Sequence, residues 1–375
     1  MTDEKKKHNG RPHRCIDVWA VPPHLFKIEK EERIKIIESM ALSKEQTLVK
    51  HTEEGPFEPN SLTTPAHISF VEEAVVVVSL GIMIGGPLAW IASMITILCV
   101  GTWTQCAVAV LISAILAYHP MPSVEYSREH IISSWWTRCI YKYFSYRFVW
   151  SGDSHIKIHE AVPWIGAGPP HGVMPFANVL SIPGINAVPG IDFLGAPASV
   201  VMNTPFLRYL TIYPSVPVGG ASLQKATEAG HCVGIVPDGI AGIFRQNEHK
   251  EVVALKHRKG LARHALRTGT NILPAYSFGN TSCFSAWWDP SGYMEKISRK
   301  AQASIFVYWG RFGLPIPRRC QITMVYGDPI YVDKVAEPAQ KQIDELHEKI
   351  LNGIRDCFEE HKASLGWGDK ELEFD

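Results

Sequence analysis

The feature that most constrains this chain is a long segment without charged residues. No Asp, Glu, Lys or Arg occurs in residues 74–124, and the apolar part of this segment, residues 74–118, is 45 residues long. As a single helix the apolar part would measure about 68 Å at 1.5 Å per residue. The hydrocarbon core of a bilayer is only about 30 Å thick. A single membrane crossing is too short for a helix of this length, whereas two crossings accommodate it.

The apolar run therefore predicts a transmembrane helical hairpin at residues 73–120. Its arms are expected at about 74–96 and 100–118, with the turn near Gly101 and Thr102. A Gly-Gly-Pro sequence in the first arm either kinks that arm or marks a different turn. The alternative is a buried helix pair in a soluble core, but core helices normally keep a polar stripe.

Charged residues on both sides of the run indicate its orientation. The positive-inside rule assigns the cytosolic side to the basic residues that follow within about 30 positions, namely Arg128, Arg138, Lys142 and Arg147. Two crossings return the preceding tail, residues 1–72, to the same side. This tail is charged and contains prolines, so we predict a cytosolic, partly disordered segment with one helix at 27–44.

Residues 121–150 combine aromatic and basic side chains. Eight aromatic residues occur between Trp135 and Trp150, interleaved with the basic residues. This mixture is typical of the boundary between membrane and water, and it predicts an interfacial segment. An ordinary aromatic core helix explains it equally well.

From residue 151 onward, short apolar runs alternate with helical stretches. Such alternation predicts an α/β domain at 151–375, with a mixed, largely parallel sheet flanked by helices. Strands are expected at 155–161, 163–167, 198–202, 232–236, 271–278 and 321–326. Helices are expected at 176–180, 204–210, 222–229, 260–268 and 340–362. Ligands of such sheets bind at the loops beyond the strand C-termini.

One of these loops carries a histidine in a rigid setting. The sequence Pro-Pro-His-Gly, residues 169–172, ends an apolar strand and is followed by Pro175, which suits a helix start. A neutral His171 beside free backbone N–H groups near Gly172 and Val173 offers a proton acceptor next to an oxyanion site. Acyl transfer to a hydroxyl needs this pair. A turn histidine bonded to local backbone is the alternative.

Two further segments are candidates for the same site. Asp238 follows a strand in a Pro-Asp-Gly turn and could orient His171 or bind a hydroxyl, although Asp-Gly is also a common turn pair. Residues 256–267 carry cations at and before a helix N-terminus, where an anion would relieve their repulsion. Phosphates of an acyl-CoA fit there, and a solvated basic face is the alternative. The candidate ligands are Arg258, Lys259, Gly260, Arg263 and, more weakly, Arg208.

Composition and motifs exclude several other classes. Lys+Arg and Asp+Glu both number 37, so no overall field attracts nucleic acid. The eight cysteines form no CxxC or CxxH pair, which argues for reduced thiols and not for a zinc or disulfide framework. His155 and His159 have no third ligand nearby, and no metal is expected. Motifs of serine hydrolases, zincins and nucleotide-binding loops do not occur.

These features together resemble the type-two diacylglycerol acyltransferase family, which includes monoacylglycerol and wax-alcohol acyltransferases. The likeness covers the hairpin and residues 147–374. It is carried by four ordered blocks: Pro-Pro-His-Gly at 169–172, the segment 258–279, Gly-Asp-Pro-Ile at 327–330 and the C-terminal segment 358–373. The family's motif is His-Pro-His-Gly, and this chain has Pro169 in place of its first histidine. The resemblance therefore implies that the retained His171 is the histidine the chemistry requires.

The resemblance also shows departures. Family members usually have Gly-Gly-x-x-Glu and Gly-Glu-Asn where this chain has residues 238–242 and 279–281, so two carboxylates are missing. Asp238 resembles instead the Pro-Glu-Gly turn of the wider glycerolipid acyltransferases. Those enzymes pair their histidine with an acid a few residues later, but here no acid follows His171 before Asp192. Whatever orients His171 must come from elsewhere in the fold or from the backbone.

The resemblance implies a glycerolipid-acyltransferase-like fold and synthesis of triacylglycerol from diacylglycerol and acyl-CoA. His171, Gly172 and Asp238 would be catalytic, acyl-CoA would be a co-substrate, and no cofactor is expected. The expected setting is the endoplasmic reticulum membrane, with both termini cytosolic, or the lipid-droplet surface; homo-oligomerisation stays open. The acceptor could instead be monoacylglycerol, a long-chain alcohol or a lysophospholipid. A silent membrane lipid-binding protein is the alternative of a different class.

Overall fold

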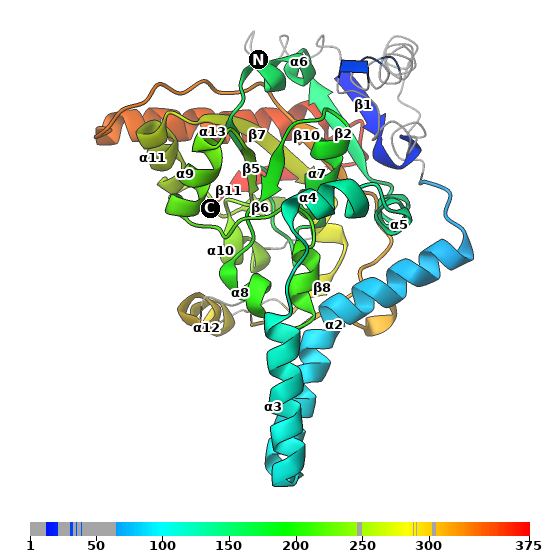
Figure 1. Cartoon of the computed structure of the whole chain (residues 1–375). Coiled ribbons are helices and arrows are strands. Elements are labelled where there is room, and N and C mark those ends of the chain that lie inside the picture. The colour runs from blue at the N-terminus through cyan, green and yellow to red at the C-terminus, as the bar shows by residue number, and fades with distance from the viewer. Residues whose placement is uncertain are drawn as a thin grey trace.

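The computed structural model describes residues 13–21, 31, 32, 35, 39, 65–245, 250–287, 289, 291–301 and 305–375. Most of the helix expected at 27–44 lies outside the described residues. The described part consists of an α/β body from which a pair of apolar helices projects (Figure 1).

A seven-stranded mixed sheet forms the centre of the body. Its order is β1-β2-β10-β7-β3-β5-β4. The strands are β1 (His13–Asp17), β2 (Arg147–Ser151), β3 (Trp164–Ala167), β4 (Phe193–Gly195), β5 (Cys232–Ile235), β7 (Asn271–Phe278) and β10 (Thr323–Tyr326). Four neighbouring pairs are parallel, and β1–β2 and β10–β7 are antiparallel. The predicted mixed, largely parallel sheet is confirmed.

Helices cover both faces of this sheet because its strands alternate between two apolar clusters. Along β7, Leu273 and Ala275 join the cluster under α7 (Phe176–Ala187), whereas Tyr276 joins the cluster under α11 (Gly260–Thr268) and α13 (Gln340–His361). The other body helices are α4 (Val124–Tyr126), α5 (Trp135–Tyr143), α6 (Ser154–Glu160), α8 (Ser199–Asn203), α9 (Gly220–Glu228), α10 (Gly239–Ile243) and α12 (Tyr293–Ala301). Two small sheets pair β6 (Lys250–Val253) with β11 (Glu371–Phe374) and β8 (Ser285–Ala286) with β9 (Tyr308–Trp309).

Two expected strands are helices. Residues 155–161 form most of α6, in which His155 and Ile158, three positions apart, are buried together with Ser154. The buried side chains thus follow the spacing of a helix, although the alternation of isoleucine with polar residues in the sequence also fits a strand. Residues 198–202 likewise lie mostly in α8. The helix expected at 204–210 is a 3₁₀ turn, Leu207–Thr211, and α7 continues past residue 180 to Ala187.

The aromatic segment belongs mainly to the core. Tyr143, Phe144, Tyr146 and Phe148 are completely buried, and Trp135, at 53% exposure, is the prominent exception. The segment is not one helix: α5 ends at Tyr143 and β2 follows. These buried aromatic side chains therefore stabilise the body from inside, and an interfacial role of the whole segment 121–150 stays a prediction.

The N-terminal region contributes one strand to the body. β1 pairs with β2, and the carboxylate of Asp17 accepts a 2.6 Å bond from Nε of Arg147, whose side chain is 2% exposed. Arg147, one of the basic residues that follow the apolar run, thus lies in a buried ion pair at the edge of the sheet. Which side of a membrane it would face stays a prediction.

The apolar run forms α2 (Phe70–Val100) and α3 (Trp103–Tyr118). α2 begins with a capping box between Ser69 and Glu72, and α3 begins with one between Thr102 and Gln105, so the break falls where the sequence predicted it. Nε1 of Trp90 donates to Oγ of Ser113 at 2.9 Å, which joins the two helices side by side.

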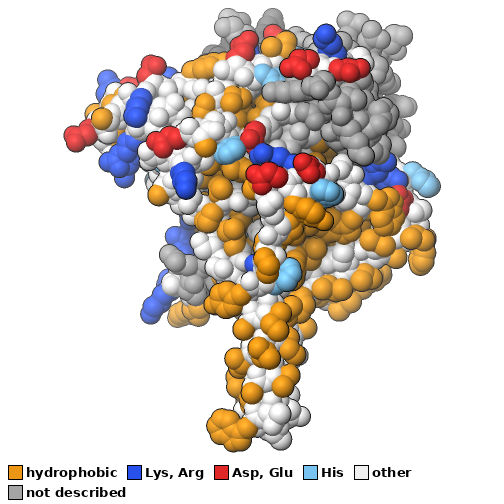
Figure 2. Space-filling model, viewed as in Figure 1, with side chains coloured by type: hydrophobic (Ala, Val, Ile, Leu, Met, Phe, Trp, Pro, Cys, Tyr) orange, Lys and Arg blue, Asp and Glu red, His pale blue; other side chains and the backbone are white. Residues whose placement is uncertain are grey.

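The two halves of α2 have different surroundings. Val76, Leu80 and Ile84, spaced by four residues, are buried against the body. The outer half projects with α3, and apolar side chains cover this projection (Figure 2). Of the described helices, α2 is the one whose length and composition suit a membrane span; α3 is apolar but shorter, with 16 residues. A membrane hairpin stays a prediction.

Candidate functional site

The Pro-Pro-His-Gly turn connects β3 to α7. Gly172 has φ +62°, and a Cβ there would lie 2.6 Å from the backbone oxygen of Asn280. Only glycine fits both the left-handed conformation and this close approach. The sequence therefore fixes the position of His171 through its neighbour as well as through the two prolines.

The imidazole of His171 is oriented by the backbone. Its Nδ1 lies 2.8 Å from the carbonyl oxygen of Gly172. Because a carbonyl oxygen can only accept, the hydrogen of this bond belongs to Nδ1. The neutral ring then has its lone pair on Nε2. A half-buried histidine held in this tautomer can accept a proton through Nε2.

Asp238 lies beneath the same turn but contacts the main chain of His171 and not its ring. Its Oδ2 accepts a 3.0 Å bond from the His171 N–H. Its Oδ1 has no hydrogen-bond partner among the described residues, and the side chain is fully buried. Burial raises the pKa of the Asp238 carboxyl, while the nearby His171 counteracts part of this rise. The structure brings His171, Gly172 and Asp238 together.

Two buried backbone donors lie at the turn without partners. Neither the N–H of Gly172 nor that of Val173 donates to any described residue, and both residues are buried. Buried N–H groups without a partner are rare in native structures because each costs free energy. Donors left open beside a histidine are the arrangement that stabilises a developing oxyanion.

A polar network that the sequence did not reveal supports the turn. The side chain of Asn280, completely buried, donates through Nδ2 to the carbonyl of Pro170 at 2.9 Å and accepts at Oδ1 from the N–H of Ala177 at 2.8 Å. Asn178 and Ser277 both donate to the carbonyl of Gly168. Asn280 occupies the position of a carboxylate expected from the family resemblance. Its departure from that pattern was the one available signal.

The basic cluster meets the turn through a single residue. Nη1 of Arg258 donates to the carbonyl of Asp238 at 2.9 Å, and burial lowers the pKa of its guanidinium. Nζ of Lys259 instead lies 2.7 Å from a carboxylate oxygen of Asp344 on α13. Gly260 begins α11, and Arg263 is exposed on that helix. Arg258 is therefore the member of the cluster that connects directly to the His171 site.

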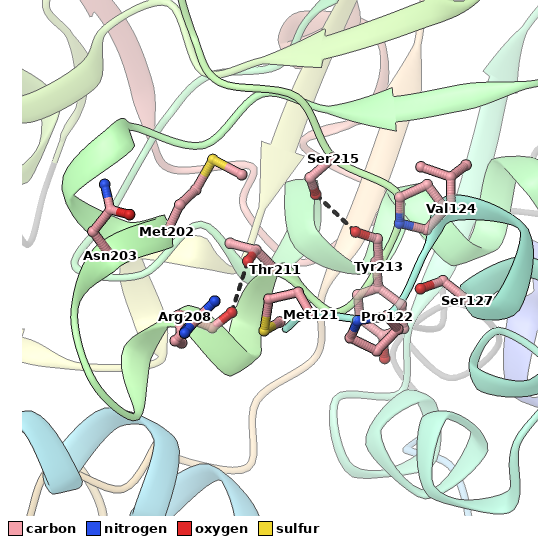
Figure 3. A pocket seen from close by; sticks show the side chains of 11 residues that line it. Met121, Pro122, Val124, Ser127, Met202, Asn203, Arg208, Thr211, Tyr213 and Ser215 are labelled. Atoms are coloured by element: carbon pink, nitrogen blue, oxygen red, sulfur yellow. Dashed lines mark hydrogen bonds between the residues drawn. The ribbon is translucent and has the colours of Figure 1, made fainter. Parts of the chain in front are cut away.

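Arg208 lies elsewhere, in a pocket of about 240 Å³ at the end of α3 (Figure 3). Its Nη1 donates to the carbonyls of Leu116 and Ala117 and so caps the last turn of that helix. Met121, Met202 and Tyr213 also line the pocket, and none of its lining residues belongs to the basic cluster. A role of Arg208 in binding acyl-CoA stays a prediction, which these contacts do not favour.

Among the described residues, no group of three or more His, Cys, Asp or Glu side chains could hold a metal ion. The two histidines considered as a metal pair in the sequence, His155 and His159, lie on α6 and not on a strand.

Known proteins similar to this chain are acyltransferases. A family model described as "Diacylglycerol acyltransferase" matches residues 98–375. Diacylglycerol O-acyltransferase 2-like protein 6 of Bos taurus is 28% identical over 294 residues, which cover 70% of this chain and 85% of that protein. Acyl-CoA wax alcohol acyltransferase 2 of Homo sapiens is 28% identical over 250 residues, covering 58% and 72%. The structure of the 1-acyl-sn-glycerophosphate acyltransferase PlsC from Thermotoga maritima is similar with a TM-score of 0.36 and 14% identity, covering 72% of this chain and 97% of that one.

The family match spans well over half of the chain. It includes the His171 turn, Asp238 and the basic cluster. The chain therefore belongs to the diacylglycerol acyltransferase family and is an acyltransferase.

Proposed function

We propose that this protein transfers a fatty acyl group from acyl-CoA to a lipid hydroxyl, with His171 as the general base. The observation that carries the proposal is the pair of buried, unpartnered N–H groups at Gly172 and Val173 beside an imidazole whose Nδ1 is engaged. A turn histidine with a purely structural role would not need open donors next to it. Acyl transfer uses both features at once.

In the proposed reaction, the acceptor hydroxyl gives its proton to Nε2 of His171 as its oxygen attacks the thioester carbon. The N–H groups of Gly172 and Val173 stabilise the resulting oxyanion. When the C–S bond breaks, CoA leaves as a thiolate, whose pKa of about 8.5 makes acid assistance unnecessary. The proton on Nε2 then passes to the thiolate or to solvent, which returns His171 to its neutral state.

Arg258 is the candidate to connect acyl-CoA with this centre. Its guanidinium has two other arginines close by, since Arg245 and Arg299 both lower its pKa further, while the nearby carboxylates of Asp238 and Glu295 raise it. A cluster of cations that repel one another gains stability from a bound polyanion, and CoA carries several phosphates. Lys259 and Arg263 would contribute from the start of α11, although Lys259 must first leave Asp344 or share it.

We also propose that α2 and α3 enter a membrane as a helical hairpin. β1 precedes these helices in the chain, β2 follows them, and the two strands pair in one sheet. A segment flanked by paired strands must leave the membrane on the side where it entered, which supports a hairpin over a single crossing. The 16 residues of α3 extend about 24 Å, slightly less than the hydrocarbon core. Both termini would then face the cytosol, at the endoplasmic reticulum or at a lipid droplet.

Diacylglycerol is the acceptor we propose, giving triacylglycerol. The family description and the bovine relative carry this acceptor in their names. The human relative named for wax alcohol keeps a long-chain alcohol open as the acceptor, and monoacylglycerol and lysophospholipid are further alternatives.

The test is label transfer from oleoyl-CoA in membranes that carry the wild type, His171→Ala or the control His130→Ala, an exposed histidine on the surface. The four acceptors are offered in parallel. Loss of a general base should lower the rate by about 10²–10⁴-fold, and the control should retain it. Label in another lipid that still depends on His171 would replace the acceptor and keep the mechanism.

The same membranes distinguish an enzyme from a silent lipid-binding protein. An enzyme releases free CoA thiol when acyl-CoA and acceptor are supplied together, and a binding protein releases none. Absence of transfer to every acceptor by correctly inserted wild type would refute the proposed activity.

A further inference from the structure

Two cysteines that are far apart in the sequence meet beside the His171 turn. The Sγ atoms of Cys283 and Cys320 are 3.0 Å apart, and the residues are separated by 37 positions. Both are free thiols; Cys283 is completely buried and Cys320 is half-buried. A disulfide bond needs about 2.05 Å between the sulfurs. A small approach of about 1 Å therefore separates this thiol pair from a covalent link.

The segments that carry the two thiols are already held together. The N–H of Arg318 donates to the carbonyl of Cys283 at 2.9 Å, and its Nη2 donates to Oγ of Ser285 at the same distance. These two hydrogen bonds hold the segment just before β10, which carries Cys320, against the segment that carries Cys283. This pre-arrangement favours a bond between these two sulfurs over other pairings.

The thiol pair contacts the support of the catalytic turn. Both sulfurs lie within hydrogen-bond distance of the Gly279 carbonyl, at 3.4 Å for Cys283 and 3.8 Å for Cys320. The next residue, Asn280, holds the carbonyl of Pro170 and faces Gly172. A change at the sulfurs is therefore connected to His171 through Gly279, Asn280 and the neighbours of His171 in the turn.

We propose that Cys283 and Cys320 form a reversible redox site that closes to a disulfide in reaction with a small-molecule disulfide such as oxidised glutathione. The accessible thiol of Cys320, as its thiolate, attacks the glutathione disulfide, forms a mixed disulfide and releases one glutathione thiolate. Cys283 then loses its proton, attacks the Cys320 sulfur and releases the second glutathione. Two thiols are oxidised by two electrons, and one glutathione disulfide is reduced to two thiols.

Order and reversibility follow from the surroundings of the two sulfurs. Burial raises the pKa of the Cys283 thiol, and nearby Arg318 counteracts part of this rise. Cys283 is consequently the slower nucleophile and acts second, where its neighbour's sulfur is already in contact. Excess reduced glutathione reverses both steps.

The link should alter the support of His171. Oxidation removes both S–H donors from the Gly279 carbonyl, next to Asn280. Because S–H is a weak donor, we count the two lost contacts together as one ordinary hydrogen bond, whose net contribution corresponds to about a fivefold change. We therefore expect acyl transfer to fall about fivefold on oxidation and to recover with dithiothreitol. The bond itself stands independently of the proposed function, whereas this effect on turnover rests on it.

The experiment uses the full chain in detergent, equilibrated with mixtures of reduced and oxidised glutathione, quenched with acid and alkylated with N-ethylmaleimide. Peptide mass spectrometry should detect a Cys283–Cys320 cross-linked pair that is absent from Cys320→Ser and present in the matched control Cys106→Ser. Cys106 is a half-buried thiol on α3. A soluble peptide with one cysteine, added to each mixture, reports that the oxidant is active, since it should carry glutathione.

Separate alkylation of both thiols in a mixture that glutathionylates the added peptide would overturn the proposal. So would accumulation of a glutathione adduct on Cys320 that never resolves to the link. A cross-link with unchanged acyl transfer would uphold the redox site and refute its effect on His171. If no acyl transfer exists in the reduced protein either, the proposed function fails while the cross-link result stands.

Discussion

Asn280 offers the sharpest test of the structure around His171. Its buried amide donates to Pro170 and to Oδ1 of Asn178, at 2.9 and 3.2 Å, and accepts from Ala177. Asn280→Ala leaves at least the Ala177 N–H and the Pro170 carbonyl without partners. Each such group costs about 1–3 kcal/mol, so two cost about 2–6 kcal/mol. At about 2–4 °C per kcal/mol, we expect Tm to fall by roughly 4–24 °C.

Asn280→Asp has nearly the same shape but replaces the donor by an acceptor. Ionised, it would put a carboxylate oxygen against two oxygens in a fully buried site, so its pKa in the folded protein should lie above the unfolded value of about 3.9. For such a group, the stability supplied by the protonated form is present below the unfolded pKa and is lost as pH rises through the folded pKa. The Tm difference from wild type should therefore be larger at pH 8 than at pH 5.5.

The measurements are thermal unfolding of both variants at these two pH values and acyl transfer per folded molecule. Asn186→Asp is the matched control, because Asn186 also donates to two carbonyls but is half-buried and lies at the end of α7. It should lose stability without the same loss of transfer. A Tm for Asn280→Ala within 1 °C of wild type, or a difference for Asn280→Asp that does not change with pH, would refute the reasoning.

Three further predictions follow from individual contacts. Gly172→Ala should abolish acyl transfer, because its Cβ meets a backbone oxygen at 2.6 Å, whereas Gly219→Ala, with nothing within 4 Å, should retain it; equal activities would contradict the assigned turn. Arg258→Ala and Lys259→Ala should raise the KM for acyl-CoA, about tenfold for loss of a charged hydrogen bond, with little change for the glyceride; an unchanged KM would exclude the CoA site. Glu251→Gln should flatten the fall of Tm with rising pH above about 4.3, because burial raises the pKa of Glu251 and its stabilising protonated form is lost as pH rises; an unaltered slope would contradict this.

Elements with strong local signals were predicted from the sequence. β7 and α11 occupy the predicted residues 271–278 and 260–268. α11 ends at Gly269, which adopts the left-handed conformation with φ +69°. Prolines and glycines likewise disclosed the His171 turn, because their backbone restrictions act within a few residues.

Elements defined by distant partners were not predictable in this way. The short segment that forms α6 fits a strand or a helix until its burial is known. β2 was hidden among aromatic residues that suit an interface as well as a core. Asn280 acts through a carbonyl 110 positions away, so no local pattern signals its role. The two free N–H groups also become visible only when all other donors are accounted for.

The pairing of β1 with β2 has a consequence for the synthesis of the chain. Asp17 faces Arg147 in the sheet, so β1 leaves the ribosome 130 residues before its partner. At about 5–20 residues per second, the strand waits roughly 7–26 s with an unpaired edge while both apolar helices are made. Both apolar helices must therefore be made before the sheet can be completed. In the proposed membrane setting, a chain whose helices failed to insert would expose apolar surface and an open strand at the same time, the two features that chaperones and degradation machinery recognise.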